Sequence, residues 1–228
     1  MLAVVALAIV LRAADPLSNP VMAAEDPYAH MALVREHLRD GRLDPALGAA
    51  ELYPPGLHAV LAVLWVYGGG DLYDLMRFAP VALGAVSILG VGVLLGRWHG
   101  PVAAVAGALA LALMPEHIFR SGLAAPTALD LALLPFLFGA LLEVARGRFE
   151  GLAAAVPIAL LMVVAHPWAL LLLALGAGVF ALLVLVCPWT PRLGGLPTLR
   201  GSAGAAAVVV GALGLAMLAT WPSTIGPG

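Results

Sequence analysis

The sequence predicts an all-α fold, a polytopic bundle of transmembrane helices. Of its 228 residues, 63% are hydrophobic and only 11% are charged, and the mean hydropathy is +1.04. A soluble domain usually carries about 25% charged residues. Apolar runs recur along the whole length, as in a polytopic membrane protein. A soluble helical bundle is excluded, because it would lack the polar residues that cover its surface.

The apolar segments define the expected helices. We expect them at 1–13, 55–68, 77–97, 101–115, 126–145, 151–165, 167–187 and 201–220. They are rich in Ala, Gly, Leu and Val, which is typical of helices that pack closely through small residues. The first segment has no basic residue before its apolar part, so we interpret it as a first span and not as a cleaved signal peptide.

The charges predict the topology. Short breaks between the later spans contain arginine, whereas segment 14–76 has nine acids and three arginines between its flanking spans. Arginine-rich short loops lie in the cytoplasm, which places 14–76 outside. This assignment requires that 55–68, only 14 residues between prolines and Gly68-Gly69-Gly70, lie on the membrane as an interfacial helix. We therefore predict seven spans with the amino terminus inside.

An acidic motif opens the external segment. It reads Glu25-Asp26-Pro27-Tyr28, and Asp followed by Pro is a typical helix start. The helix should run to about Arg39 and stop near Gly41. At 100° per residue, one stripe holds Met31, Val34 and Leu38, and an adjacent stripe holds Asp26, His30 and His37. The sequence therefore predicts an amphipathic helix on the outer surface.

Two interpretations of these polar residues stay open. In the functional interpretation Asp26, together with Glu25, binds a divalent cation that clamps a phosphate, or acts as a general base. In the structural interpretation Asp26 simply caps the helix. His30 and His37 are either ligands or polar residues of the membrane interface. A nucleic-acid partner is not expected, because the net charge is −2. The single Cys187 excludes an internal disulfide.

The order of motifs resembles a known family. The acid-Asp-Pro-aromatic loop is followed by an amphipathic helix and then by Leu52 to His58, which is similar to the GT-C glycosyltransferases. Within that class the chain is most similar to the catalytic subunit of oligosaccharyltransferase. Further similarities lie in Phe78 to Arg97, in Met114 to Ala124 with its Arg120-Ser121-Gly122 turn, and in Ala165 to Trp168.

The resemblance implies roles for particular residues. Asp26 matches the first-loop catalytic acid and metal ligand, with Mg²⁺ or Mn²⁺ as cofactor. The second acid of the family is missing at 125–128, so we expect Asp130, a carboxylate inside a span, or Glu116 as metal ligand to replace it. Glu25, His30, Arg120 and His166 are expected to bind substrate. The alternatives are a polar contact between helices for Asp130 and an interfacial anchor for Arg120.

The resemblance also implies a function. We expect the transfer of a glycan from a lipid-linked polyprenyl-phosphate donor to an acceptor protein or glycan, by a multi-pass protein of the plasma membrane whose site faces outside. The carboxy-terminal soluble domain of the family is absent from the 228 residues, so we expect this chain to be an amino-terminal part. Alternatives are a mannosyl- or aminoarabinosyl-transferase, a transporter, or a lipid-binding membrane protein without catalytic activity.

Overall fold

The computed structural model describes residues 1–40, 55–145, 148–166 and 169, and over these residues it contains helices and no strand. The predicted all-α fold is confirmed for this part of the chain. The predicted helices at 167–187 and 201–220 and the second half of the first external segment, 41–54, lie outside the described residues, apart from Ala169.

The described residues form eight helices, and all of them except α6 correspond to predicted segments. Their bounds are α1 (Leu2–Ser18), α2 (Asp26–Asp40), α3 (Gly56–Gly68), α4 (Leu72–His99), α5 (Pro101–Leu113), α6 (Pro115–Gly122), α7 (Pro126–Ala145) and α8 (Gly151–Ala165). Prolines open α5, α6 and α7, where a missing backbone N–H costs nothing. Gly100, with φ of 90°, makes the tight turn between α4 and α5 that residues with a Cβ rarely adopt.

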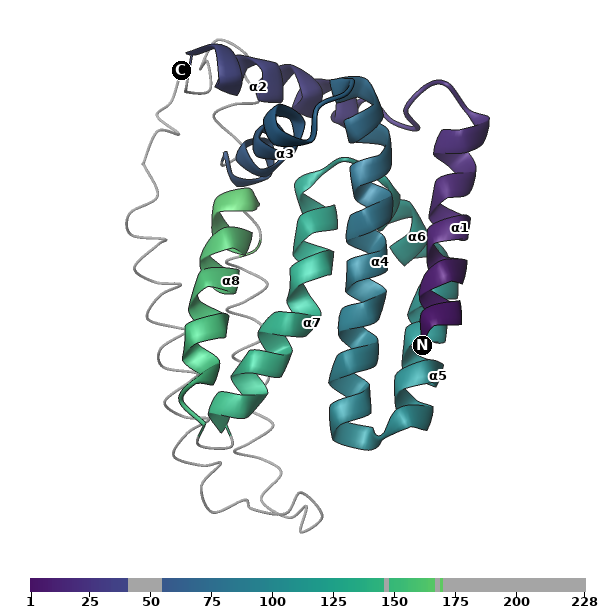
Figure 1. The fold of residues 1–228 in the computed structure, drawn as a ribbon, viewed down its shortest axis with the longest axis vertical. Helices are drawn as coiled ribbons and strands as arrows, with labels where there is room; N and C mark the ends of the chain where they lie inside the picture. The colour runs from purple at the N-terminus through teal and green to yellow at the C-terminus, as the bar shows by residue number, and fades with distance from the viewer. Residues whose placement is uncertain (41–54, 146–147, 167–168, 170–228) are drawn as a thin grey trace, which may run out of the picture. The chain divides into compact units, whose positions relative to one another are not determined.

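The chain divides into two compact units, and the first consists of residues 1–139 and 158–167. Within it α4 is the central helix, in contact with α1, α2, α3, α5 and α6, and α2 lies crosswise at one end of α4 (Figure 1). One apolar core joins α2 and α3 to the long helices; its buried members are Val34, Leu57, Leu61, Ala62, Leu72, Met76, Ala124, Leu129 and Ala165. This core holds α2 and α3 in place.

The second unit consists of residues 140–157 and 168–228, and only 140–145, 148–157 and 169 of it are described. It contains the end of α7 and the start of α8. Arg148 donates a hydrogen bond of 2.8 Å to the half-buried carboxylate of Glu143 across the hairpin.

Two described helices are long and apolar enough to cross a membrane, Leu72–His99 and Pro126–Val144. A third span results if α5 and α6, which are bent by 69° relative to each other, are counted as one. The helices α3 and α8 are shorter. The protein therefore has two or three candidate spans among the described residues, as expected of a membrane protein, and α3 is too short to be one of them.

The structure differs from the sequence prediction in three places. Residues 115–122 form the short helix α6, where we expected a turn. The helix predicted from residue 77 already begins at Leu72, because the Asp71 side chain accepts a hydrogen bond from the Tyr73 amide. On α2 the buried large aliphatic residues are Leu33 and Val34, whereas Leu38, predicted on the apolar stripe with Val34, is 40% exposed within the described residues.

Candidate functional site

The acidic motif stands exposed at the start of α2. Both Glu25 and Asp26 are exposed, and neither carboxylate forms a side-chain hydrogen bond or ion pair with the described residues. The free amides of Tyr28 and Ala29 are instead satisfied by the backbone carbonyl of Glu25. The interpretation of Asp26 as a side-chain cap is therefore not supported, and its carboxylate is available to solvent and solutes.

The aromatic residue of the motif holds the loop before α2. The hydroxyl of Tyr28 accepts a hydrogen bond from the Met22 amide at 3.2 Å and lies 3.4 Å from the hydroxyl of Tyr73. Tyr73 in turn donates to the carbonyl of Pro20 at 2.6 Å. Arg77 adds hydrogen bonds to the carbonyls of Pro16 and Asn19. The start of α4 therefore determines where residues 16–22 lie, and with them the approach to Asp26.

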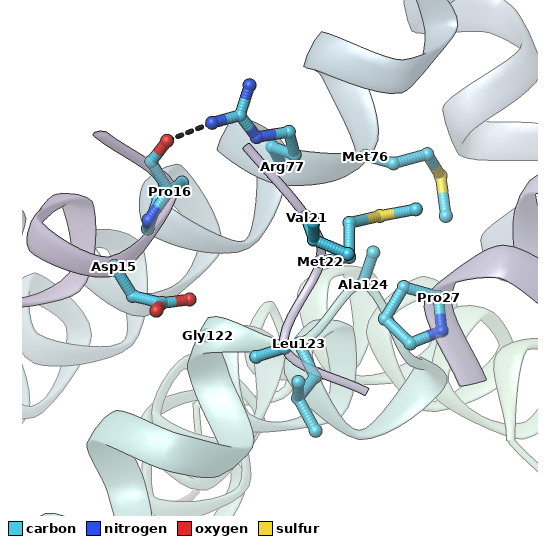
Figure 2. A pocket seen from close by; sticks show the side chains of 11 residues that line it. Asp15, Pro16, Val21, Met22, Pro27, Met76, Arg77, Gly122, Leu123 and Ala124 are labelled. Carbon is cyan, nitrogen blue, oxygen red and sulfur yellow. Dashed lines mark hydrogen bonds between the residues drawn. The ribbon is translucent and has the colours of Figure 1, made fainter. Parts of the chain in front are cut away.

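An open pocket lies beside this loop (Figure 2). Its volume is about 310 Å³, including solvent at its mouth, and its lining comes from four places in the chain: Asp15, Pro16, Val21, Met22, Ala23, Pro27, Met76, Arg77, Gly122, Leu123 and Ala124. Figure 2 shows the Arg77 guanidinium directed to the Pro16 carbonyl, with the Asp15 carboxylate turned away from it. One guanidinium and one carboxylate thus line the pocket without pairing with each other.

Two buried histidines connect α2 and α3. His30 is 3% exposed and His58 is fully buried, and Nδ1 of His30 lies 3.0 Å from Nε2 of His58. Because each neutral ring has one donor and one acceptor nitrogen, one ring donates to the other. Burial lowers the pKa of His30, the nearby Asp26 carboxylate partly opposes this, and His166 lowers it further. His30 is therefore held neutral at pH 7.

A second polar pair lies in the same unit, between α7 and the end of α8. Nδ1 of His166 lies 3.1 Å from Oδ2 of Asp130, and both side chains are nearly buried. The angles are not those of a hydrogen bond, so both Asp130 oxygens and this His166 nitrogen have no hydrogen-bond partner among the described residues. We therefore treat the contact as electrostatic. A buried carboxylate with so little compensation is costly and marks a functional position more often than a structural one.

The tertiary structure links four of the seven predicted site residues by electrostatic interactions. Asp26 and His166 both influence His30, and His166 contacts Asp130. Asp26 and Asp130 therefore each interact with one of two histidines, His30 and His166, that also influence each other.

The remaining predicted residues are arranged differently. Glu116 accepts a hydrogen bond of 2.8 Å from Arg120 one helical turn later, and both side chains are more than half exposed on α6. This pairing reduces the capacity of Glu116 to bind a metal and of Arg120 to bind a phosphate. Glu25 lies exposed next to Asp26.

A metal site is not complete within the described residues. No three or more of their His, Cys, Asp and Glu side chains are placed to hold one ion. Mg²⁺ and Mn²⁺ take oxygen ligands, and the exposed Asp26 carboxylate supplies only one such group here. The predicted cofactor therefore needs ligands from outside the described part of the chain.

Sequence reasoning missed two residues of this region. His58 was noted only as the end of the motif at 52–58, although it is the partner of His30. The sequence pattern assigns no role to Arg77, although its guanidinium lines the pocket and holds the loop. A buried histidine in an otherwise apolar helix was the available signal for His58, because such a polar ring requires a partner.

No family model matches the sequence, and no curated protein matches it.

Proposed function

We propose that this protein belongs to the membrane machinery that transfers a sugar or glycan from a polyprenyl-phosphate-linked donor to an acceptor at the outer membrane surface. The acceptor is a protein in the oligosaccharyltransferase-like form of this proposal, and a lipid or glycan in the mannosyl- or aminoarabinosyl-transferase-like form. The complete topology in this proposal has seven spans in the plasma membrane, with α2 and α3 on the external face.

One observation carries the proposal. The pocket is lined by Pro27, which follows the exposed Asp26, and by Gly122 to Ala124, which follow the Arg-Ser pair. These two motifs are nearly 100 residues apart, and each contributes to the resemblance to GT-C enzymes. This solvent-open pocket, whose lining residue Pro27 directly follows the exposed Asp26 in the chain, is the proposed place of the acceptor nucleophile.

The chemistry assigns a simple role to Asp26. In an inverting transfer the acceptor nucleophile attacks the anomeric carbon, the bond from that carbon to the phosphate oxygen breaks, and the polyprenyl (pyro)phosphate leaves with the bonding electrons. The Asp26 carboxylate orients the acceptor and accepts its proton. Since Asp26 forms no ion pair with the described residues, it need not release another partner before it binds the acceptor.

A divalent cation, Mg²⁺ or Mn²⁺, is part of the proposal as the group that neutralises the leaving phosphate. Asp26 is its proposed first ligand. Because the described residues alone do not form a metal site, we assign no geometry to it and derive no step from it.

The experiment is a glycan-transfer assay with Asp26→Asn, performed on the full-length protein in membranes with a lipid-linked donor. We expect transfer to fall by about 10²- to 10⁴-fold, the range for loss of a general base. Glu150→Gln is the matched control, because Glu150 is also an exposed acid and does not line the pocket. Undiminished transfer by correctly inserted Asp26→Asn protein contradicts the proposal.

A transporter is the second candidate, and the Asp130–His166 pair favours it. Buried carboxylates and histidines inside spans mark proton and ion pathways. Uptake into proteoliposomes distinguishes the two functions. If the protein is a transporter, the unaltered protein shows coupled uptake and Asp130→Asn loses it. If it is a transferase, even the unaltered protein shows no uptake.

A further inference from the structure

Another buried polar cluster lies between α1, α4 and α6. It shares no residue with the histidine pair of α2 and α3. Its members are Arg12, which is 3% exposed, His117 at 5%, Ser87 at 2% and the fully buried Ser121. The proposed reaction uses none of them. A charged side chain inside an apolar helix is costly and is retained where it has a function.

The cluster is fully connected by hydrogen bonds. Arg12 donates from Nε to the Ser121 hydroxyl at 2.8 Å, and one terminal nitrogen lies 2.6 Å from Nδ1 of His117. A guanidinium can only donate, so His117 accepts at Nδ1. The neutral ring then carries its proton on Nε2, which lies 3.1 Å from the Ser87 hydroxyl and donates to it. Ser121 donates to the His117 carbonyl.

Arg12 has no acidic partner in the part of the chain that the structure describes. Its remaining hydrogen bond goes to the Ala8 carbonyl, and none of the described carboxylates contacts it. The space for its side chain comes from Gly84 on α4: a Cβ there would stand 2.6 Å from Cδ of Arg12 and 3.0 Å from the Ser121 hydroxyl. The helices are therefore shaped around the guanidinium, and its interactions are directional hydrogen bonds rather than charge pairs.

These hydrogen bonds are what attach α6 to the rest of the unit. The buried residues of α6 are His117 and Ser121, and both bind Arg12. Of its two large apolar side chains, Phe119 is 54% exposed and Ile118 is only partly buried. The fully buried contacts of this eight-residue helix are therefore polar ones; the helix leaves α5 at an angle of 69° and leads directly into Gly122 to Ala124 of the pocket.

We propose that Arg12 is a positioning residue that sets the direction of α6 and thereby places the 122–124 turn at the pocket. Its role in the reaction rests on the proposed function, whereas its effect on α6 does not. Arg12 touches no substrate in this proposal and acts only through His117 and Ser121.

The experiment measures the position of α6 directly. We introduce spin labels at position 102 on α5 and position 119 on α6 in a Cys187→Ser background. Both positions are exposed in the unaltered chain. The distribution of distances between the two labels is measured for the full chain in membranes. We expect Arg12→Gln and Gly84→Ala to shift and broaden the distribution, because one removes the guanidinium and the other displaces it. Arg12→Lys, which keeps the charge without the planar fork, should lie in between. Val10→Ala, on the exposed face of α1 with Val10 64% exposed, is the matched control and should change nothing.

Transfer is assayed in parallel on the same unlabelled variants. A displaced turn should lower transfer on the order of 10²-fold, as a small misplacement of reacting groups does, with Arg12→Lys partly restoring it. An unchanged distance distribution in both Arg12→Gln and Gly84→Ala overturns the inference, and so does a changed distribution with full transfer. If the unaltered protein transfers no sugar while the distances respond as expected, the proposed function fails and the effect of Arg12 on α6 stands. Gly84→Ala provides the readout if Arg12→Gln does not fold.

Discussion

Nε2 of His58 lies 3.0 Å from Nδ1 of His30, although 28 residues separate them in the chain. The two rings connect α2 and α3, and their centroids are 5.2 Å apart at a tilt of 39°. Both histidines are buried, so water cannot replace either partner in this contact. The pair therefore ties the acidic start of α2 to the helix beside it.

Loss of the histidine pair should destabilise the external helices. We expect His58→Leu to lower the free energy of unfolding by about 1–3 kcal/mol, the cost of leaving a buried polar partner without this hydrogen bond. A double-mutant cycle with His30→Leu, measured by thermal unfolding in detergent, should give a coupling energy above about 0.5 kcal/mol. Strictly additive effects of the two substitutions would show that the rings do not interact.

Stability should depend on pH through His30. Burial lowers the pKa of His30 below its ordinary value of 6.5, so the unfolded chain binds a proton at a higher pH than the folded protein does. The stabilisation is fully present above pH 6.5 and is lost as the pH falls below it, by at most about 1.4 kcal/mol per pH unit for one group. Melting temperatures between pH 7.5 and 5 should fall less steeply in His30→Gln than in the unaltered protein. His99→Gln, at an exposed histidine, is the control; an equal slope for His30→Gln and the unaltered protein contradicts this prediction.

The Tyr28 hydroxyl should be what orders the loop before α2. Tyr28→Phe keeps the ring but removes the acceptor for the Met22 amide and the contact with Tyr73. We expect a loss of about 1 kcal/mol and faster hydrogen exchange at Met22. Tyr67→Phe is the control, because Tyr67 is 86% exposed. Unchanged exchange at Met22 in Tyr28→Phe would mean that another contact orders the loop.

Gly56 should tolerate no side chain. A Cβ at Gly56 would stand 2.7 Å from the Ala165 amide nitrogen, so α3 and the end of α8 would have to separate. Gly56→Ala should cost about 1–3 kcal/mol, as overpacking does. Gly68→Ala at the other end of α3 meets no atom within 4 Å and should be neutral or slightly stabilising. Equal melting temperatures for these two variants would show that the close approach does not exist.

Transfer should require a divalent cation. We expect EDTA to abolish glycan transfer and added Mg²⁺ or Mn²⁺ to restore it, because the leaving phosphate carries negative charge that needs neutralisation. Mg²⁺ titration of Asp26→Asn should show no recovery at concentrations that saturate the unaltered protein. Full transfer in EDTA would exclude the metal from the mechanism.

The sequence by itself determined the class of the protein and the helix positions. The eight described helices occupy the predicted segments within a few residues, apart from α6, because apolar length and Pro or Gly breaks act locally. It also identified Asp26 and His30 as members of one helix face, since the 100° repeat is local. The start of α4 was missed by five residues because the Asp71 cap gives a weaker signal than the apolar run.

Only the tertiary structure decided which of these residues meet. Periodicity put Leu38 on the buried stripe of α2, but the buried face is set by what packs against it, and α3 and α4 cover Leu33 and Val34 instead. In the folded chain His58 contacts His30, His166 contacts Asp130, and Arg12 donates a hydrogen bond to Ser121, from which it is separated by 109 residues in the sequence. A local pattern carries no information about such distant partners, because their contact depends on helix packing and on the hydrogen bonds that buried polar groups require.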